Sequence, residues 1–525
     1  MNIPTIPKRI LNPNPIRIRT TNLPRSRHYR ILSCSSSKQD LKGQTIAVVG
    51  LSKSGRAAAK LALIRGASVL AVDKNENLVP LEKDPTFEGD GCLKTILGDC
   101  RREILESVDR VVVSPGVSIE NYGLSSLLQS GRRVMSELDF AAEVLPKDIK
   151  ILAITGTNGK STVTTFAGQM LCQLGIKAFV GGNLGDPLSE GAFQCLTSPS
   201  SEPEFQVAVV EVSSYQLEIP NNHFCPSVAV ILNLTPDHLE RHKTMKNYAA
   251  TKCRIFSHMS FSKLAILPVG NQHLNEAFSG YVDKCNVAWI GAFPGIKVNT
   301  EKKVADLIFA STGDDFTLQL RTLKATGNHN YHNAAIAAFS VLTLDVGIET
   351  KSMSSTIEFL NPPPHRMQIV HSDAHDVTWV DDSKATNVEA AYTGLMGLKE
   401  QKSVVLLGGI AKVLNVEGDI GFEPLVEPLE YHKCVITFGS SGPKIQQTLL
   451  AAGLSIPCYN VATLEDAVFC ARRIAISGDT VVLSPSCASF DAFKNFEHRG
   501  NVFQELARAT TADFYNRYFK HRERF

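Results

Sequence analysis

From residue 41 onward, short runs of hydrophobic residues alternate with segments of mixed hydrophobic and polar residues, and glycines stand at many of the junctions. Residues 45–49 (TIAVV) and 67–72 are predicted to form buried strands, and residues 56–65 between them to form a helix. A strand, a helix and a second strand in this order are typical of a parallel sheet covered by helices. The pattern therefore predicts an α/β domain over residues 40–138.

The turn after the first predicted strand carries candidate ligand contacts. It reads Gly50-Leu51-Ser52-Lys53-Ser54-Gly55, so its glycines are five residues apart and do not follow the GxGxxG spacing. Backbone amides at the start of the next helix can still bind a phosphate, and Asp73, where the second strand ends, can accept a hydrogen bond from a ribose or a base. A further strand at 111–116 ends at the same edge. A tight turn without a ligand is the alternative interpretation.

A second unit begins at residue 149. A strand at 150–155 leads into GTNGKST at 156–162, and a helix is predicted over 163–174. A strand, a glycine-containing loop, a lysine, a hydroxyl and a helix form the arrangement that binds a nucleoside triphosphate, although this spacing is shorter than GxxxxGK[ST]. Backbone amides then surround the phosphates, the lysine neutralises the transferred phosphoryl group and the hydroxyl can bind magnesium. The residues concerned are Gly156, Thr157, Asn158, Gly159, Lys160, and Ser161 or Thr162.

Two later strands of this unit end in polar residues. The strand at 205–212 reaches Glu211, and the strand at 227–234 leads into Thr235-Pro236-Asp237-His238. We expect adjacent parallel strands to bring Glu211 and His238 together beyond the phosphate loop, where a carboxylate could bind magnesium. Polar strand ends without a ligand are the alternative. Lys252, in a helix-like segment, would by itself be interpreted as solvated.

A third region follows the prolines at 362–364 and has its own alternation of strands and helices. Predicted strands are 378–380, 403–407, 433–438 and 479–483, and a helix is predicted over 464–476. Most of these strands end in small or charged residues, as in a second doubly wound α/β domain whose strand ends line a site. The central unit is therefore predicted over 139–362 and the third over 363–525.

Composition narrows the class of protein. The chain has 525 residues, of which 43% are hydrophobic and 20% charged, as expected for a soluble globular protein of several domains. No hydrophobic run approaches the roughly 18 residues that cross a bilayer. The 12 cysteines include no CxxC pair. We therefore expect no membrane span, zinc site or disulfide framework.

Charge is distributed unevenly along the chain. Residues 1–39 contain eight basic side chains and no acidic one, so the formal net charge of +2 leaves −6 for the remainder, which argues against nucleic acid as a partner. An arginine-rich, serine-containing and acid-free N-terminus is typical of organelle transit peptides. Its five prolines disfavour the long amphipathic helix that a mitochondrial targeting peptide forms. We expect the chloroplast or plastid stroma, with the mitochondrion or cytoplasm as alternatives, and a basic arm without a targeting role remains open.

The motifs together resemble those of the Mur ligases, a family of ATP-dependent enzymes that form amide bonds in peptidoglycan precursor synthesis. The resemblance extends over residues 44–505. Segments that resemble the family as a whole are GTNGKST at 156–162, EVSSYQLE at 211–218, TPDHLERH at 235–242, the Lys252 region, GNHNYHNAAIA at 327–337 and PHR at 364–366. DDSKATN at 381–387 and SPSCASFDAFKNFEHRG at 484–500 resemble the members that add D-glutamate.

This resemblance implies a fold and an activity. It implies a Rossmann-like N-terminal domain for the UDP substrate, a central P-loop ATPase-type domain for ATP, and a Rossmann-like C-terminal domain for the amino acid. The implied reaction adds D-glutamate to UDP-N-acetylmuramoyl-L-alanine. Because a carboxylate is a poor electrophile, ATP first converts it to an acyl phosphate, which the amine of D-glutamate then attacks. A monomer is expected.

The resemblance also implies roles for individual residues. The implied catalytic residues are Lys160, His238, Lys252 and Lys384. One magnesium ion would be bound by Ser161 or Thr162 with Glu211, and a second by His238 and a carbamylated Lys252. ATP would contact the 156–162 loop, Asn330 (adenine), Arg366 (phosphates) and Asp382 (ribose). The UDP-sugar substrate would contact Gly50, Ser52, Lys53, Ser54, Gly55, Asp73 and Asn183, and D-glutamate would contact Lys384, Thr386, Lys412, Ser489 and Phe496.

Some positions depart from the family pattern. The segment GGIAKVLN at 408–415 differs around Lys412, Phe490 is larger than the usual apolar residue, and Lys74-Asn75 differs on the uracil side. Residues 192–204 carry no motif. Two other functions stay open: a non-catalytic plastid protein that has retained the fold, and a small-molecule kinase built on the phosphate loop.

Overall fold

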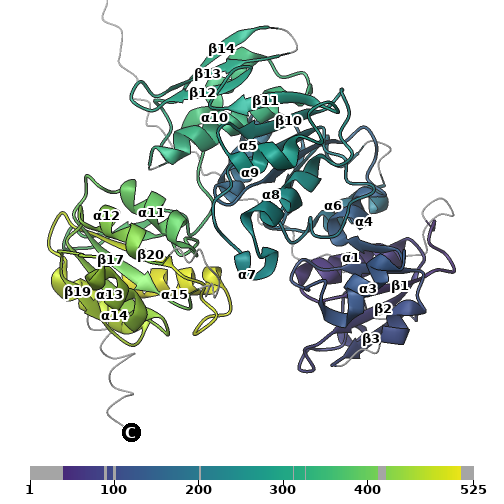
Figure 1. Cartoon of the computed structure of the whole chain (residues 1–525), viewed down its shortest axis with the longest axis horizontal. Coiled ribbons are helices and arrows are strands. Elements are labelled where there is room, and N and C mark those ends of the chain that lie inside the picture. Colours follow the sequence, from purple (N-terminus) through teal and green to yellow (C-terminus); the bar gives the residue numbers. More distant parts are fainter. Residues whose placement is uncertain are drawn as a thin grey trace, which may run out of the picture.

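The computed structural model describes residues 39–87, 91–98, 102–199, 203–310, 313–325, 327–411 and 421–509. Three lobes follow one another along the chain, and each contains its own sheet, with the central lobe between the other two (Figure 1). The three-domain α/β fold expected from the sequence is confirmed. The basic leader and Lys412 lie outside the described residues, apart from position 39. No helix in the described ranges is long and apolar enough to cross a membrane.

The first domain contains a parallel five-stranded sheet in the order β3-β2-β1-β4-β5. Its strands are β1 (Thr45–Val49), β2 (Ser68–Asp73), β3 (Leu93–Leu97), β4 (Arg110–Val113) and β5 (Val134–Ser136), and its helices are α1 (Lys53–Ile64), α2 (Arg102–Glu106), α3 (Leu124–Gln129) and α4 (Glu137–Ala142). The predicted βαβ unit is confirmed. Helix α1 begins three residues earlier than predicted, inside the turn. A Cβ atom at Gly55 would lie 1.8 Å from the Gly50 carbonyl oxygen, so only glycine permits this close approach.

The central domain contains a nine-stranded sheet in the order β14-β13-β12-β11-β10-β9-β6-β8-β7. Its strands are β6 (Lys150–Thr155), β7 (Ala178–Gly182), β8 (Val207–Glu211), β9 (Val228–Ile231), β10 (Leu264–Pro268), β11 (Asn286–Ile290), β12 (Gly295–Asn299), β13 (Val304–Ile308) and β14 (Asp315–Gln319). Its helices are α5 (Lys160–Gln173), α6 (Leu188–Thr197), α7 (Leu239–His242), α8 (Met245–Cys253), α9 (Gln272–Phe278) and α10 (His329–Leu342). Strands β12 to β14 pair antiparallel and extend the parallel part.

The central sheet corrects one expectation from the sequence. Strands β8 and β9 are not adjacent, because each pairs with a different edge of β6. The phosphate loop follows β6, so Glu211 from β8 and the segment after β9 reach this loop from opposite sides. The segment without a motif, 192–204, begins inside helix α6.

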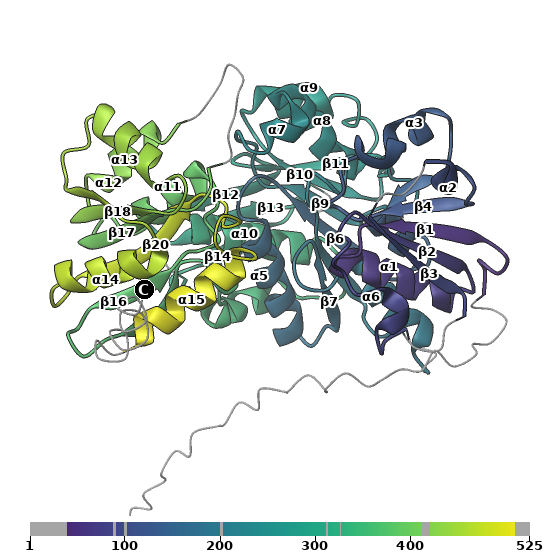
Figure 2. The same ribbon diagram turned by 90° about the horizontal axis from the view of Figure 1, so that it is seen from below.

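The C-terminal domain contains a six-stranded sheet in the order β15-β16-β20-β17-β18-β19, in which only β15 is antiparallel. Its strands are β15 (Gln368–Ser372), β16 (Thr378–Asp381), β17 (Ser403–Gly408), β18 (Cys434–Phe438), β19 (Cys458–Asn460) and β20 (Thr480–Ser486). Its helices are α11 (Val388–Met396), α12 (Val426–Leu429), α13 (Gly442–Ala451), α14 (Leu464–Ile474) and α15 (Phe496–Arg508). Helices cover both faces of this sheet (Figure 2). Short 3₁₀ helices are η2 (Leu81–Lys83), η3 (Asn121–Gly123), η4 (Arg254–Phe256), η5 (Thr350–Phe359) and η6 (Glu423–Leu425).

Hydrophobic burial explains why these strands form where they do. Strand β8 reads VAVVE and strand β18 reads CVITF, and every side chain of both is buried. Side chains of a parallel sheet face helices on both sides, so near-continuous apolar runs are expected there. Polar side chains that could bind a ligand must therefore lie where the strands end.

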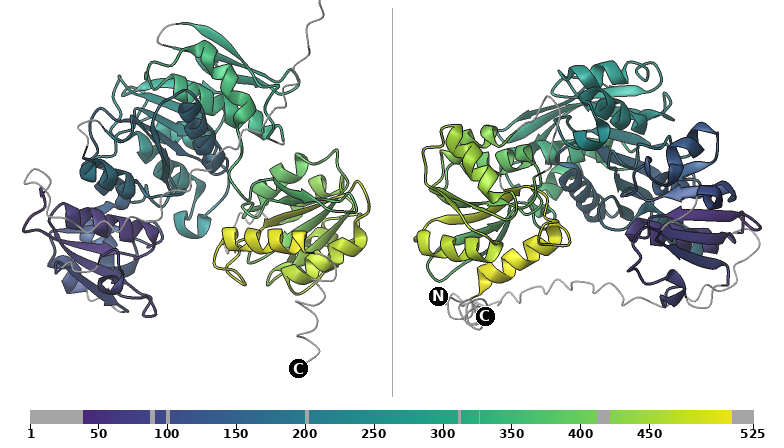
Figure 3. Two further views of the ribbon diagram at one scale, coloured as in Figure 1. Left: turned by 180° about the vertical axis from the view of Figure 1, so that it is seen from behind. Right: turned by 60° about the horizontal axis from the view of Figure 1, so that its bottom comes forward.

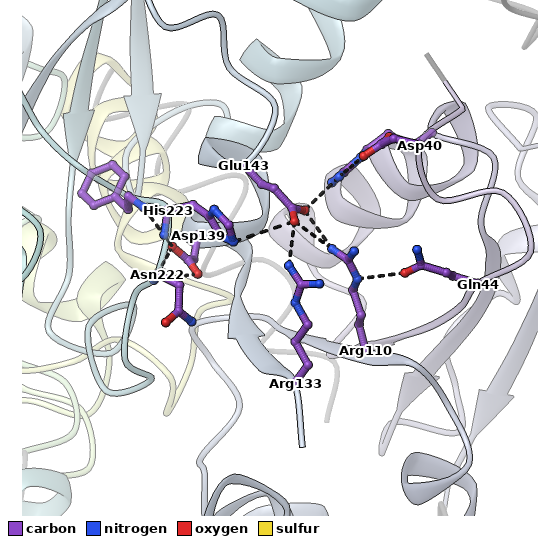
Figure 4. Close-up of polar contacts among 10 residues, drawn as sticks. Asp40, Gln44, Arg110, Arg133, Asp139, Glu143, Asn222 and His223 are labelled. Carbon is purple, nitrogen blue, oxygen red and sulfur yellow. Dashed lines mark hydrogen bonds and ion pairs between the residues drawn. The ribbon is translucent and has the colours of Figure 1, made fainter. Parts of the chain in front are cut away.

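Helix α4 joins the first domain to the central one through carboxylates (Figure 4). Glu143, which caps it, accepts hydrogen bonds from Arg65 (2.8 Å), Arg110 (2.9 Å) and Arg133 (2.7 Å) of the first domain. Asp139 accepts from the backbone N–H groups of residues 222–224 in the central domain at 2.7 to 2.9 Å. The predicted boundary at residues 138 and 139 thus falls inside a helix that is bonded to both domains.

Candidate active site

The phosphate loop lies between β6 and α5. Two glycines with positive φ and hydrogen bonds to Asn233 fix its conformation. Gly156 has φ +147 and Gly159 has φ +84, conformations that favour glycine. The Asn233 side-chain oxygen accepts from the backbone N–H groups of Thr157 (3.0 Å) and Asn158 (2.9 Å). Helix α5 begins at Lys160, three residues before the predicted start, so its N-terminal amides directly follow the loop. The N-terminal amides of α5 suit a polyphosphate.

Lys160 lies over this loop. Its Nζ donates to the carbonyl oxygens of Gly156 (3.0 Å) and Thr157 (2.7 Å). A lysine in this position places a positive charge beside the phosphate-binding amides. The predicted location of Lys160 agrees with the structure, and its catalytic role stays a prediction.

Glu211 and Thr162 form the part of the site that fits a cation. Glu211 is buried, and its Oε1 accepts from the Asn183 side chain at 2.8 Å. Glu211 Oε2 and Thr162 Oγ1 are buried without a hydrogen-bond partner in the described chain. Buried oxygen atoms of this kind are the ligands that magnesium prefers. Ser161, the other predicted hydroxyl ligand, is buried beside them.

Two lysines keep Glu211 ionised. Burial would raise the pKa of its carboxyl, but the positive charges of Lys384 and Lys160, with hydrogen bonds from neighbouring side chains, hold that pKa below its ordinary value. Lys384 belongs to the C-terminal domain and Lys160 to the central one. The structure thus brings these two predicted catalytic lysines to one carboxylate, although they are more than 200 positions apart in the sequence.

Lys252 is buried, which corrects its interpretation as a solvated side chain. It is 1% exposed, and its Nζ donates to the Gly156 carbonyl oxygen at 2.9 Å. Burial lowers the pKa of Lys252 well below its ordinary value; the charge of Lys160 lowers it further, and Asp237 opposes this. The sequence alone could not show this, because helix α8 brings Lys252 to the loop only after folding.

His238 stands at the entrance of helix α7 with φ +55, a conformation that is strained for a histidine. Its Nδ1 lies 2.7 Å from the Tyr215 hydroxyl, and its Nε2 lies 3.5 Å from an Asp237 carboxylate oxygen. Within the described ranges no three His, Cys, Asp or Glu side chains form a metal-binding group.

A cavity of about 200 Å³ separates the phosphate loop from the C-terminal domain. It is lined by Asn158, Gly159, Asn233, His329, Asn333, Arg366, Met367, Asp382, Glu389, Ala390, Thr393 and Gly394. Burial raises the pKa of Asp382 to about 7, although Arg366 opposes the shift. Asn330 lies next to the cavity and accepts a 3.1 Å hydrogen bond from Asn333. Asn330 itself does not line the cavity, whereas its neighbours His329 and Asn333 do. Neither of these two residues was predicted from the sequence.

Lys384 belongs to the predicted amino-acid site. Its ammonium lies 5.2 Å from the centre of the Phe496 ring, and burial lowers its pKa to about 8 while Glu211 opposes the shift. Thr386 donates through its backbone N–H to the Lys384 carbonyl oxygen (3.0 Å), and Ser489 is buried. The sequence places Lys412 here as well, but it lies outside the described residues.

Arg499 holds the loops of this site, and the sequence analysis did not single it out. Its buried guanidinium donates to Ser383 Oγ (3.0 Å) and Ser383 O (2.8 Å). It also reaches the carbonyl oxygens of Cys487 (3.1 Å), Gly408 and Ala488 (both 3.3 Å). Arg499 belongs to the segment 484–500 that carried the family resemblance, so its position in that motif was the available signal.

The turn of the first domain is bonded mainly to itself. Asp73 accepts from the backbone N–H groups of Leu51 (2.6 Å) and Asn75 (2.9 Å). Lys53 points to the central domain, where it donates to Gly185 O (2.7 Å) and pairs with Asp186 (3.0 Å). Ser52 precedes α1 and Ser54 lies in its first turn. The roles of these residues toward a UDP group stay predictions.

A hydrogen bond links the central and C-terminal domains beside the site. The Asn387 side chain donates to Asp237 Oδ2 at 3.1 Å. Both residues lie inside motifs that the sequence analysis quoted, 235–242 and 381–387, but neither was selected. Views from behind and from a tilted direction show the C-terminal domain beside the central domain (Figure 3).

Known protein families match each of the three domains. Residues 44–136 match the Mur ligase MurD-like N-terminal domain, residues 154–341 the Mur ligase middle domain, and residues 365–487 the Mur ligase glutamate ligase domain. These ranges agree with the three sheets of the structure.

Curated relatives and solved structures agree with these family matches. The chain is 33% identical to the UDP-N-acetylmuramoylalanine--D-glutamate ligase of Desulfatibacillum aliphaticivorans, over 90% of this chain and 100% of that protein. It is 34% identical to the Rubrobacter xylanophilus protein of the same name, over 88% and 97%. The fold resembles UDP-N-acetylmuramate-alanine ligase from Thermotoga maritima (TM-score 0.53, 17% identity, 89% and 99% covered) and a MurF ligase from the same organism in complex with ADP (0.53, 18%, 89% and 96%). The chain belongs to the Mur ligase family.

Proposed function

We propose that this chain is an ATP-dependent ligase that adds D-glutamate to UDP-N-acetylmuramoyl-L-alanine in peptidoglycan precursor synthesis. The curated relatives carry this activity in their names and align over 97 to 100% of their length. One feature of the site carries the proposal: the charges of Lys160, from the phosphate loop, and Lys384, from the amino-acid domain, both lower the pKa of the buried Glu211 carboxyl. A ligase needs this convergence, because the activated acid and the incoming amine must meet.

The residues suggest a division of work. The alanine carboxylate of the substrate attacks the γ-phosphorus of ATP, ADP leaves, and Lys160 offsets the negative charge that gathers there. The D-glutamate amine then attacks the acyl carbon, loses a proton, and inorganic phosphate leaves. Lys384 offers a positive charge for the carboxylates of D-glutamate, and Arg499 fixes the loop beside it.

ATP and Mg²⁺ are the proposed cofactors. When bound, magnesium offsets phosphate charge during phosphoryl transfer. Glu211, Thr162 and Ser161 suit one ion, because Glu211 and Thr162 each have a buried oxygen without a protein partner. We propose a second ion near His238 and Lys252, with Lys252 carbamylated. A buried lysine with a lowered pKa supports this, because a neutral amine is the form that adds CO₂ and releases a proton.

A single assay separates the candidate functions. The purified chain is incubated with ATP, Mg²⁺, UDP-N-acetylmuramoyl-L-alanine and D-glutamate, and phosphate and product are measured by colorimetry and mass spectrometry. We expect one phosphate per amide formed, and dependence on both acceptor substrates. Phosphate release that ignores D-glutamate would indicate a kinase or ATPase, and no turnover by folded protein would favour a non-catalytic role.

We also propose that residues 1–39 direct the chain to the plastid stroma and that the enzyme is a monomer. The acid-free, arginine-rich composition supports the first. A fluorescent fusion of residues 1–60 that stays in the cytosol or enters mitochondria would contradict the targeting. Light scattering that gives twice the 57.2 kDa chain mass would contradict the monomer.

A further inference from the structure

Arg241 lies between the first and central domains and bonds to both. Its Nη2 donates to Val117 O (3.0 Å) in the first domain and to Glu218 Oε2 (2.5 Å) in the central domain. Its Nη1 lies 3.5 Å from Pro115 O. The side chain is 17% exposed. A guanidinium that serves two carbonyl groups and a carboxylate fixes their relative positions, because its donors are rigid and planar.

The loop that Arg241 contacts supports the turn of the first domain. Ser114 Oγ donates to Gly50 O at 2.7 Å. A Cβ atom at Gly50 would lie 2.6 Å from Val117 Cγ2, so Val117 packs directly on this turn. Any ligand-induced shift of the Gly50 turn is therefore transmitted to the carbonyl group that Arg241 binds.

In the central domain, Arg241 contacts Tyr215, whose hydroxyl lies next to His238. The Arg241 guanidinium lies 4.0 Å from the centre of the Tyr215 ring. The Tyr215 hydroxyl lies 2.7 Å from His238 Nδ1. A continuous series of contacts thus runs from the Gly50 turn through Val117, Arg241 and Tyr215 to His238.

Helix α7 needs such external support. It is a single turn, and the residues at both its ends, His238 (φ +55) and Lys243 (φ +68), have left-handed backbone conformations. These conformations are unfavourable for side chains with a Cβ and persist only where neighbours enforce them. Figure 1 and the left view of Figure 3 both show α7 projecting from the central domain between the other two. Arg241 supplies a bond across the domain boundary from this single turn.

We propose that Arg241 is a positioning residue that couples occupancy of the first-domain turn by a uridine diphosphate group to the orientation of His238. The inference rests on the proposed function for the identity of the ligand. Arg241 does not touch reacting atoms; it acts through Tyr215. The enzyme would thereby align His238 only when the sugar nucleotide is in place.

The kinetic test is a double-mutant cycle with Arg241→Met and Tyr215→Phe. If Arg241 acts through the tyrosine hydroxyl, each single variant lowers kcat about 10- to 100-fold, as expected for a misplaced catalytic group. The kcat of the double variant then stays within about threefold of that of the less active single variant, because both substitutions break the same series of contacts. KM for ATP is unchanged. Arg241→Lys keeps the positive charge but not the planar guanidinium, so its kcat should lie between those of Arg241→Met and the wild type.

Arg254→Met is the matched control. Arg254 also lies beside Glu218, donating to Leu217 O (3.1 Å) and to the Glu218 carbonyl oxygen, but among the described residues it makes no hydrogen bond or ion pair with the first domain. We expect less than a threefold change in kcat for this variant. Multiplicative losses in the double variant, or an equal loss in Arg254→Met, would overturn the proposal. Thermal unfolding of every variant checks that the fold is intact.

A second readout does not need turnover. ¹⁵N-histidine spectra of the full chain, assigned for His238 with His238→Gln, are recorded with and without UDP. Wild type should show a UDP-dependent change of the His238 Nδ1 signal, and Arg241→Met should lose it. A change that is equal in both proteins, or absent from wild type, would overturn the coupling. Failure of the wild-type product assay refutes the proposed ligase function separately.

Discussion

Removing the Glu143 carboxylate should destabilise the first domain selectively. Glu143 pairs with three arginines of very different exposure: Arg65 at 1%, Arg110 at 9% and Arg133 at 45%. In Glu143→Ala, the exposed Arg133 loses almost nothing, because surface pairs contribute about 0 to 1 kcal/mol. Arg65 keeps its bonds to Asp40 (2.7 and 3.1 Å). The main cost falls on Arg110.

The size of this cost follows from what Arg110 retains. Its remaining partner is the neutral side chain of Gln44 at 3.0 Å. Leaving a buried charge without its counter-ion costs about 3 to 5 kcal/mol, and the neutral hydrogen bond offsets a part, so we expect a loss of about 3 kcal/mol. A domain of this size has an m-value of roughly 1 to 2 kcal/mol per molar urea. The urea midpoint of the first domain should therefore fall by about 2 M.

Two spectroscopic signals separate the domains. Both tryptophans, Trp289 and Trp379, lie outside the first domain, so their fluorescence follows the other two. Circular dichroism should show an early transition in Glu143→Ala that fluorescence does not. The control is Glu106→Ala, which removes an exposed i,i+4 pair with Arg102 and should change little. If Glu143→Ala behaves like this control, the buried-charge argument is refuted.

The same variant gives a pH dependence with a defined sign. Although burial opposes it, the bonds and charges of Arg65 and Arg110 lower the pKa of Glu143 below its ordinary value of 4.5. A carboxyl with a lowered folded pKa stabilises the protein above its ordinary pKa, and this contribution is lost as pH falls through the folded pKa. The stability difference between wild type and Glu143→Ala should persist at pH 7 and shrink below pH 4.5. A difference independent of pH would contradict this assignment.

Three further predictions concern the active site. Lys252→Ala should lower kcat by at least about 100-fold while the variant still unfolds cooperatively, and turnover near that of wild type would exclude the carbamate role. Because burial lowers the pKa of Lys384 to about 8, its charge disappears as pH rises through this value, and KM for D-glutamate should increase there; Lys384→Arg should remove this rise, and a KM independent of pH in wild type would contradict it. Arg499→Met should raise KM for D-glutamate more than KM for ATP, because Arg499 holds the loops at Ser383 and Cys487; equal changes in both constants would indicate a general structural effect.

Local patterns in the sequence predicted the phosphate loop and about half of the strands in the described residues, but few of the helices. The strand at 150–155 was predicted with the bounds that β6 has, because a buried parallel strand is a short apolar run ended by polar residues or glycine. Strands β12 to β14 were not predicted. Their burial alternates or is incomplete, as in Val304–Ile308, so their hydrophobic signal is weaker. Helix α5 began at Lys160 rather than 163, because Gly159 ends the loop in a left-handed conformation that sequence periodicity does not reveal.

The sequence by itself determined the three α/β domains, the phosphate loop and the family, because glycine positions, hydrophobic runs and motif spacing are properties of neighbouring residues. Tertiary structure alone decided how distant residues act on one another. It buried Lys252 against Gly156, brought Lys384 to Glu211, and placed Arg241 between two domains. Burial and nearby charge set the state of each of these groups, and both depend on chain segments that meet only when the sheets and helices pack together.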